Sequence, residues 1–138
     1  MRKRGAIALG IVLLLAACGG GTPAEPSNSA AVRPTTSAVL DIASPEAGAV
    51  VRGDHVDLVV DLEGATLTDV TSTDLRPDEG HLHVSLDDEL VSMTSGLEQV
   101  LPGLSPGEHL LRVEFVANDH FPFEPRVLAA VSFRVKRR

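Results

Sequence analysis

Apolar and polar residues alternate along most of the chain after Ala38. The pattern is clearest over residues 55–62, where one side carries Val56, Leu58, Val60 and Leu62. Strict alternation of this length is typical of a β-strand that buries one face and exposes the other, usually beside antiparallel neighbours. We therefore expect Leu58 to lie in a core and Asp57 to face solvent.

The same pattern recurs in short segments separated by turns that are rich in Gly, Pro, Asn and Asp. The predicted strands are residues 38–42 with a continuation at 49–51, then 55–62, 65–70, 80–86, 89–94, 97–101, 109–115 and 127–135. No segment has helical periodicity over a useful length. Seven or eight short strands at this spacing predict an immunoglobulin-like antiparallel β-sandwich over residues 38–136, with a small β-barrel as the alternative. The expected centre of its core is Leu58, Val84, Val113 and Val131.

The N-terminal segment has a different pattern. Three basic residues precede an apolar run from Ala6 to Ala17, which is the layout of a secretory signal peptide and is too short for a comfortable membrane span. The run ends in Leu15-Ala16-Ala17-Cys18, which resembles the lipobox of bacterial lipoproteins. That resemblance implies a signal peptide over residues 1–17 and a lipid, such as palmitate, on Cys18. An ordinary secretory signal that ends near a cysteine is the alternative.

Residues 18–37 join this segment to the predicted domain. They are rich in Gly, Ser and Pro and have no apolar periodicity, so they predict a flexible linker. Counting strands from this linker places its entry at the same end of the sandwich as the basic tail Lys136-Arg137-Arg138. We therefore expect that tail to face lipid headgroups.

Composition excludes several classes of function. The net charge is −7, and an acidic chain is unsuited to neutralising the phosphates of nucleic acid. There is no Trp or Tyr on which a carbohydrate-binding module would stack sugars, and Cys18 is the single cysteine, so no disulfide supports the fold. No nucleophile elbow, phosphate loop or dinucleotide fingerprint occurs, and the pair Asp87-Asp88 falls in a predicted turn. These observations favour a protein that is not an enzyme.

Two histidines on one predicted strand are the strongest candidates for chemistry. His81 and His83 are two residues apart in 80–86, so both side chains point to the same face. Imidazole nitrogens are suitable ligands for zinc and copper. The alternative is that both are partly exposed strand residues that hydrogen-bond to acidic loops. His109 is in phase with buried positions, so we expect it to have a structural role.

Strand counting extends this candidate site. Each turn sends the chain to the opposite end of the sandwich, which gathers His55, the strand pair and the loop residue His120 at one end, with Met93 nearby. The sequence therefore predicts a copper or zinc site with His81, His83 and His120 as ligands and Met93 or His55 as a fourth. Acidic residues expected to orient the rings or to supply oxygen ligands are Asp78, Glu79 and Asp119.

Three pieces of the second half of the chain form a second resemblance. They are Gly80-His81-Leu82-His83-Val84, Pro106-Gly107-Glu108-His109 and the loop from Asn118 to Pro125. Together they resemble an uncharacterised family of small histidine-containing domains of the bacterial envelope. The resemblance supports the fold class and draws attention to the histidines, and it implies no activity.

These expectations combine into one prediction of function. The chain is predicted to be a non-enzymatic binding or accessory protein of the cell envelope, held by the lipid on Cys18 at the extracytoplasmic face of the cell membrane. A protein-interaction module with an envelope protein as partner is the first interpretation. A transition-metal-binding envelope protein is the alternative.

Overall fold

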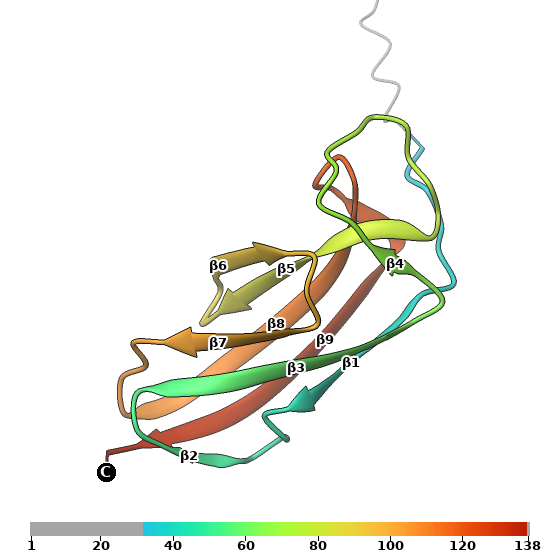
Figure 1. Cartoon of the computed structure of the whole chain (residues 1–138). Helices are drawn as coiled ribbons and strands as arrows, with labels where there is room; N and C mark the ends of the chain where they lie inside the picture. Colours follow the sequence, from blue (N-terminus) through green and yellow to red (C-terminus); the bar gives the residue numbers. More distant parts are fainter. Residues whose placement is uncertain (1–31, 138) are drawn as a thin grey trace, which may run out of the picture. The chain divides into compact units, whose positions relative to one another are not determined.

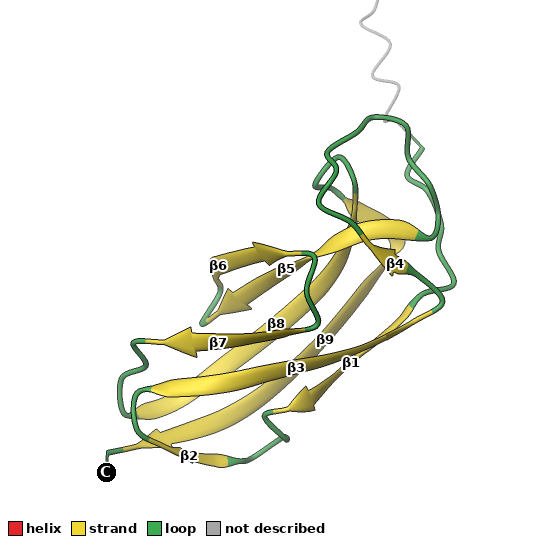
Figure 2. Cartoon of the chain, in the orientation of Figure 1, coloured by secondary structure: helices red, strands yellow, loops and turns green. Residues whose placement is uncertain are grey.

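The computed structural model describes residues 32–137, which form nine β-strands and no helix (Figure 2). The strands are β1 (Val39–Ser44), β2 (Val50–Arg52), β3 (His55–Glu63), β4 (Thr66–Leu67), β5 (Glu79–Leu86), β6 (Glu89–Thr94), β7 (Glu98–Pro102), β8 (Gly107–Ala117) and β9 (Pro122–Lys136). Within these residues no helix is long and apolar enough to cross a membrane. The predicted signal peptide, Cys18 and the first part of the linker lie outside the described residues.

Two β-sheets pack face to face (Figure 1). The smaller sheet has the order β1-β3-β7, and the larger has the order β2-β9-β8-β5, with β4 and β6 both paired with β5. All long strands pair antiparallel, whereas the short strands β2 and β4 pair parallel to β9 and β5. This arrangement is an immunoglobulin-like β-sandwich, which confirms the predicted fold class.

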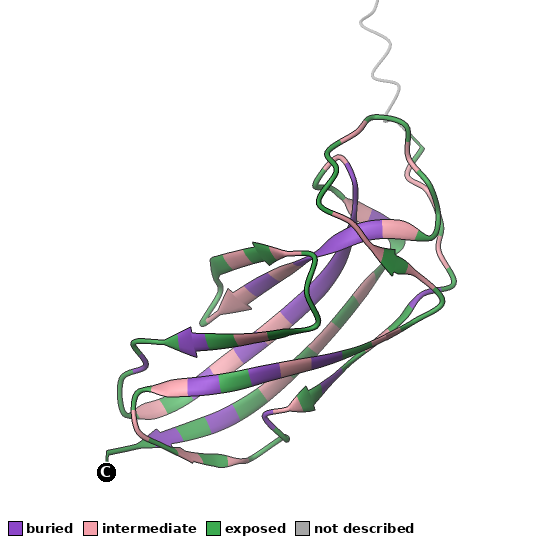
Figure 3. Ribbon diagram, viewed as in Figure 1, coloured by how far each residue is buried: buried purple, intermediate pink, exposed green. Residues whose placement is uncertain are grey.

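The core lies between the sheets and follows the alternation seen in the sequence. Leu58, Val84 and Val113 are buried, and Asp57 is exposed, so the predicted phase of these strands is confirmed. Val131 is only partly buried, because the core is deepest further along β9, at Phe133. Buried and exposed positions alternate along β3 and β9, as Figure 3 shows.

His109 has a structural role, as expected. It joins the turns at the end of the sandwich opposite the β8–β9 loop. His109 is buried, its Nε2 lies 2.7 Å from the carbonyl oxygen of Ser105, and its Nδ1 lies 2.7 Å from Asp87 Oδ2. The backbone N–H of Leu110 donates to the other oxygen of Asp87. Asp87 and Asp88 have φ angles of 51° and 68°, as a two-residue type I′ hairpin turn requires, so this pair is part of a turn.

The path between β3 and β5 differs from the prediction. Residues 65–70 were expected to form a strand that returns the chain to the other end of the sandwich. Only Thr66–Leu67 forms a strand, and it pairs parallel to β5, so the chain crosses from one sheet to the other without changing ends. The prediction counted one strand too many. Elements that precede residue 65 were therefore assigned to the wrong end of the sandwich relative to the elements that follow.

The start of the domain shows the same correction. Arg33 and Pro34, which were expected in the flexible linker, bond to Asp119 and to the backbone of β9 near the β8–β9 loop. Ordered contacts therefore begin before Ala38, at the end of the sandwich that holds this loop. Lys136 lies at the other end, where its carbonyl accepts from Gly53 N–H. The predicted common end for the linker entry and the basic tail is wrong.

Gly80 allows β5 to approach β8 closely at the start of the strand. A Cβ atom at Gly80 would overlap the backbone carbonyl of Val116 and lie 2.9 Å from the ring of Phe115. We expect Gly80→Ala to lower the free energy of unfolding by about 3 kcal/mol or more, because backbone atoms in the core of a sheet cannot move aside cheaply. Gly96→Ala is the matched control, since its Cβ meets nothing nearer than 3.4 Å and should change stability by less than about 1 kcal/mol. Urea unfolding of both variants tests this, and equal effects would contradict it.

The Asp87–His109 pair makes stability depend on pH. Hydrogen bonding to the Ser105 carbonyl, followed by the interaction with Asp87, raises the pKa of His109, and the Leu110 N–H, followed by His109, lowers the pKa of Asp87. Because the pKa of His109 is raised, this histidine stabilises the fold fully below about pH 6.5, and the stabilisation is lost as the pH rises through its pKa in the folded state. Because the pKa of Asp87 is lowered, this aspartate stabilises the fold above about pH 4, and the stabilisation is lost as the pH falls through its pKa in the folded state. His109→Gln should therefore have a lower melting temperature than the original chain, and the difference should be larger at pH 5 than at pH 9. An equal difference at both pH values would show that the pair is not ionised.

Candidate metal centre

Three histidine side chains meet on the outer face of the larger sheet. His81 Nε2 lies 2.9 Å from His120 Nδ1 and 3.2 Å from His83 Nε2, and His83 Nε2 lies 3.4 Å from His120 Nδ1. One ligand atom from each residue thus belongs to a small triangle. The structure brings together the three residues that the sequence predicted as principal ligands.

The strand pairing explains how these rings meet. His81 and His83 project from the same face of β5, and β5 pairs with β8 through His81 opposite Val116. The chain leaves β8 at Ala117 and turns back into β9 at Pro122, so residues 118–121 lie beside the start of β5. A backbone hydrogen bond from His120 N–H to the Ala117 carbonyl closes this turn and aims the third ring back at the strand.

The triangle has the size of a metal-coordination site. A tetrahedral ion with three imidazole ligands at about 2.0–2.1 Å separates the ligand nitrogens by roughly 3.3–3.4 Å. The observed separations of 2.9, 3.2 and 3.4 Å need only a small outward shift of one ring to match. Each of the three nitrogens carries either a hydrogen or a lone pair, so hydrogen bonds cannot satisfy all three contacts of the triangle at once. A cation at the centre would instead accept a lone pair from each of the three nitrogens. Three close histidines can therefore hold a metal ion.

Burial favours the uncharged form of the two strand histidines. His81 is 6% exposed, and burial, followed by the nearby His120 and His83, lowers its pKa to about 4. Burial, followed by His120, also lowers the pKa of His83. Metal ligands must be deprotonated imidazoles, so His81 and His83 are in the coordinating form at neutral pH. The alternative of two partly exposed strand histidines bonded to acidic loops does not match the burial of His81.

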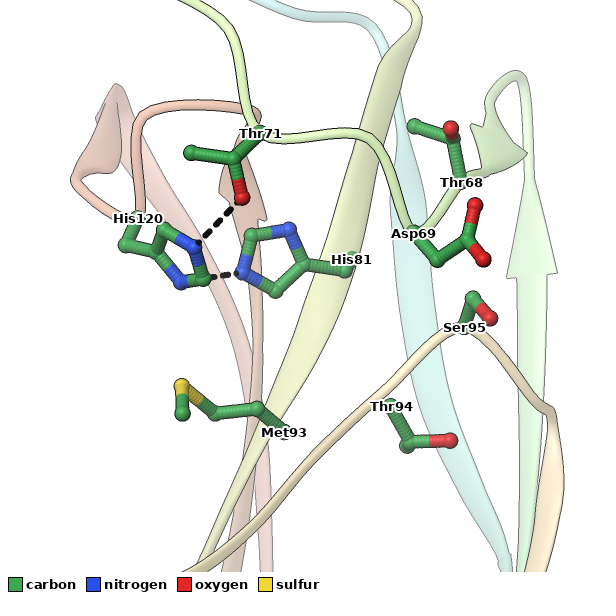
Figure 4. A pocket seen from close by; sticks show the side chains of 8 residues that line it. All are labelled: Thr68, Asp69, Thr71, His81, Met93, Thr94, Ser95 and His120. Carbon is green, nitrogen blue, oxygen red and sulfur yellow. Dashed lines mark hydrogen bonds between the residues drawn. The ribbon is translucent and has the colours of Figure 1, made fainter.

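The far side of His120 is held by a hydroxyl group. Thr71 Oγ1 lies 3.2 Å from His120 Nε2, and Figure 4 shows the two side chains facing each other. A partner on the second ring nitrogen orients the ring of a ligand, and here Nδ1 of His120 faces the other two histidines. The Ser72 N–H donates to the Asn118 carbonyl, which ties the same two loops together. Thr71 was not predicted, because a single threonine in a polar loop gives no signal in the sequence.

Met93 lies beside the histidines, as predicted. It is the direct cross-strand partner of His83, and it lines a pocket of about 290 Å³ together with His81 and His120. In Figure 4 the Met93 side chain lies below the rings of His81 and His120, and Met93 is 57% exposed. The remaining pocket residues are Thr68, Asp69, Thr71, Thr94 and Ser95. The pocket beside His81 and His120 is therefore lined by a thioether, several hydroxyl groups and the carboxylate of Asp69.

His55 is not part of this site, which corrects the prediction of a fourth imidazole ligand. It begins β3 opposite Pro102, and its Nδ1 lies 3.3 Å from Asp54 at the end of the sandwich that also holds His109. His55 was assigned to the wrong end because the strand count included a full strand at 65–70. The structure forms only the short β4 there, parallel to β5.

Two of the three acidic residues expected around the rings have other partners, and no side-chain contact joins the third, Asp78, to the histidines within the described residues. Asp119 makes a bidentate ion pair with Arg33, and Glu79 lies near Arg76. Asp119 still raises the proton affinity of His81 through its charge, so it acts on the site from a distance. Among the acidic residues of the described chain, none completes a cluster with the three histidines.

Comparison with known proteins gives similarity of fold. No family model matches the chain, and the comparison with curated proteins gives no match. The fibronectin(III)-like modules of CbhA from Clostridium thermocellum are 12% identical, with a TM-score of 0.47, over 72% of this chain and 98% of that chain. The PKD domain of human KIAA0319 is 15% identical, with a TM-score of 0.46, over 82% of this chain and 93% of that chain.

Proposed function

We propose that this chain is a lipid-anchored envelope protein that binds a transition metal through His81, His83 and His120. The observation that carries the proposal is the triangle of ring nitrogens 2.9–3.4 Å apart. Its rings come from a rigid strand and a hydrogen-bonded turn, and burial lowers the pKa values of the two strand histidines. Such a site needs no rearrangement of the sheet to accept an ion.

Copper fits the surroundings better than zinc. Imidazole suits both metals, but a thioether such as that of Met93 is a soft ligand that favours Cu(I). Met93 is the cross-strand partner of His83 and lines a pocket together with His81 and His120. We therefore propose copper as the preferred ion, with Met93 as the fourth ligand and zinc as the weaker competitor.

Metal titration of the soluble chain tests the proposal. Residues 32–137 carry their own core, so a form that starts at Gly19 keeps the domain, and acetylation removes an N-terminal amine that would itself bind Cu(II). We expect calorimetry or chelator competition to give a dissociation constant below about 10 µM. Met93→Leu should lower the affinity for Cu(I) more than that for zinc.

Two ligand variants and one control sharpen the titration. His83→Ala and His120→Gly should weaken binding more than about 100-fold, because losing even a partner of a ligand costs about 10–100-fold. His120 has a φ of 66°, a backbone conformation that is sterically more favourable for glycine than for histidine. His120→Gly should therefore not destabilise the fold. His55→Ala, at the other end of the sandwich, should bind as the original chain does. Binding unchanged in His83→Ala would remove the metal proposal.

The lipid anchor is the second part of the proposal and rests on the lipobox resemblance alone. If Cys18 is acylated, the entry of the chain at Arg33 puts the histidine end of the domain, and not the basic tail, next to the tether. Cells that express the precursor should incorporate a fatty-acid analogue into the protein, and Cys18→Ala should abolish the label and leave the signal peptide uncut. Labelling that persists in Cys18→Ala would exclude acylation of this cysteine.

The first interpretation from the sequence was a protein-interaction module, and an immunoglobulin-like β-sandwich fits that role. The envelope partner and the absence of enzymatic activity stay predictions. Metal binding is the function that a specific set of contacts supports.

A further inference from the structure

One guanidinium group holds the loop that carries His120. Arg33 donates from Nη1 to Asp119 Oδ2 at 2.6 Å and from Nη2 to Asp119 Oδ1 at 2.9 Å. The same side chain donates from Nε to the Pro122 carbonyl at 2.8 Å and from Nη2 to the Phe121 carbonyl at 3.0 Å. All four hydrogen bonds of this side chain therefore end on residues 119–122, on both sides of His120.

The loop needs such support. His120 has a positive φ of 66°, which costs energy for a residue other than glycine. Asp119 also accepts a hydrogen bond from Phe121 N–H at 3.1 Å, so its carboxylate links the Arg33 side chain to the turn itself. Arg33 and Asp119 are partly buried, with side-chain exposures of 24% and 18%, and their contact is bidentate, which makes the pair stronger than a single-contact pair in open solvent.

We propose that Arg33 and Asp119 are positioning residues of the metal site: they hold the 118–121 turn so that His120 Nδ1 points at His81 and His83. The proposal rests on the metal-binding function proposed above. Arg33 precedes the first strand, so the segment through which the chain enters the domain also sets the geometry of a metal ligand. Neither residue touches the ion.

The sign of the effect separates positioning from simple electrostatics. Arg33 carries a positive charge near a site for a cation, and Asp119 carries a negative one. If charge alone mattered, Arg33→Gln would strengthen metal binding and Asp119→Asn would weaken it. If positioning matters, both variants weaken binding, because each breaks the bidentate pair.

The matched control is a second bidentate pair on the same sheet. Arg126 donates to both oxygens of Glu114 at 2.7 and 2.6 Å. Glu114 lies directly opposite His83 on β8, so this pair is close to the site but outside the 118–121 turn. Arg126→Gln therefore removes a comparable ion pair. Copper affinity of the acetylated chain from Gly19 to Arg138 should fall about tenfold in Arg33→Gln and Asp119→Asn. It should not fall in Arg126→Gln, because removing that cation leaves the Glu114 carboxylate opposite His83, where its charge favours a bound cation. The nitrogen coupling in the Cu(II) electron paramagnetic resonance spectrum should change from three nitrogens to a mixture containing two in the first two variants only.

A measurement without metal makes the proposal independent of the titration. The His120 N–H is bonded to the Ala117 carbonyl, so its hydrogen exchange reports whether the turn is closed. Exchange at this amide should speed up in Arg33→Gln and not in Arg126→Gln. If the original chain binds no metal but this exchange pattern appears, the proposed function fails while the hold on the turn stands.

Three results would overturn the positioning role. One is tighter copper binding by Arg33→Gln, which would mean that charge dominates. Another is equal loss of affinity in Arg33→Gln and Arg126→Gln, which would mean that general destabilisation is the cause. The third is unchanged affinity and unchanged His120 exchange in Arg33→Gln.

Discussion

The close pairing of β5 with β8 is the constraint on which the candidate site depends. Gly80 lets the two backbones approach where β5 begins, and this sets the register that puts His81 opposite Val116. The register then decides which residues of the β8–β9 turn lie above the strand. A slip by one residue would turn both strand histidines toward the core, because side chains alternate between the two faces. The core and the site thus share one determinant.

Part of this arrangement is readable from the sequence. Alternation along residues 80–86 places His81 and His83 on the outer face whatever the topology, and that prediction is confirmed. The topology was predicted less well, because the apolar residues Ala65, Leu67 and Val70 predict a strand over 65–70, of which only Thr66–Leu67 forms one. Burial explains the difference: a true strand such as β3 alternates between buried and exposed positions, whereas Val70 is 57% exposed. One misassigned strand was enough to place His55 and the linker entry at the wrong ends.

Of the residues around the site, Asp119 was predicted from the sequence, whereas Arg33 and Thr71 give no signal there. Arg33 is 86 residues from Asp119, and a basic residue in a Pro- and Ser-rich stretch resembles any solvated charge. Thr71 is likewise an ordinary loop residue until the fold places it against His120. Contacts of this kind depend on where two loops meet, which local periodicity does not encode. Ligands on a strand are therefore easier to predict than the residues that position them.

The arrangement of the three histidines is costly in several ways, and this supports the proposed metal binding. His81 is held neutral by burial, its ring nitrogen faces two others, and His120 occupies a left-handed backbone conformation. None of these features supports the core, which is built on the inner face of the same strands. Proteins retain strained or desolvated groups mainly where a function uses them. A cation at the centre of the triangle would take up the three lone pairs, so the features that cost stability would serve as preorganised ligands.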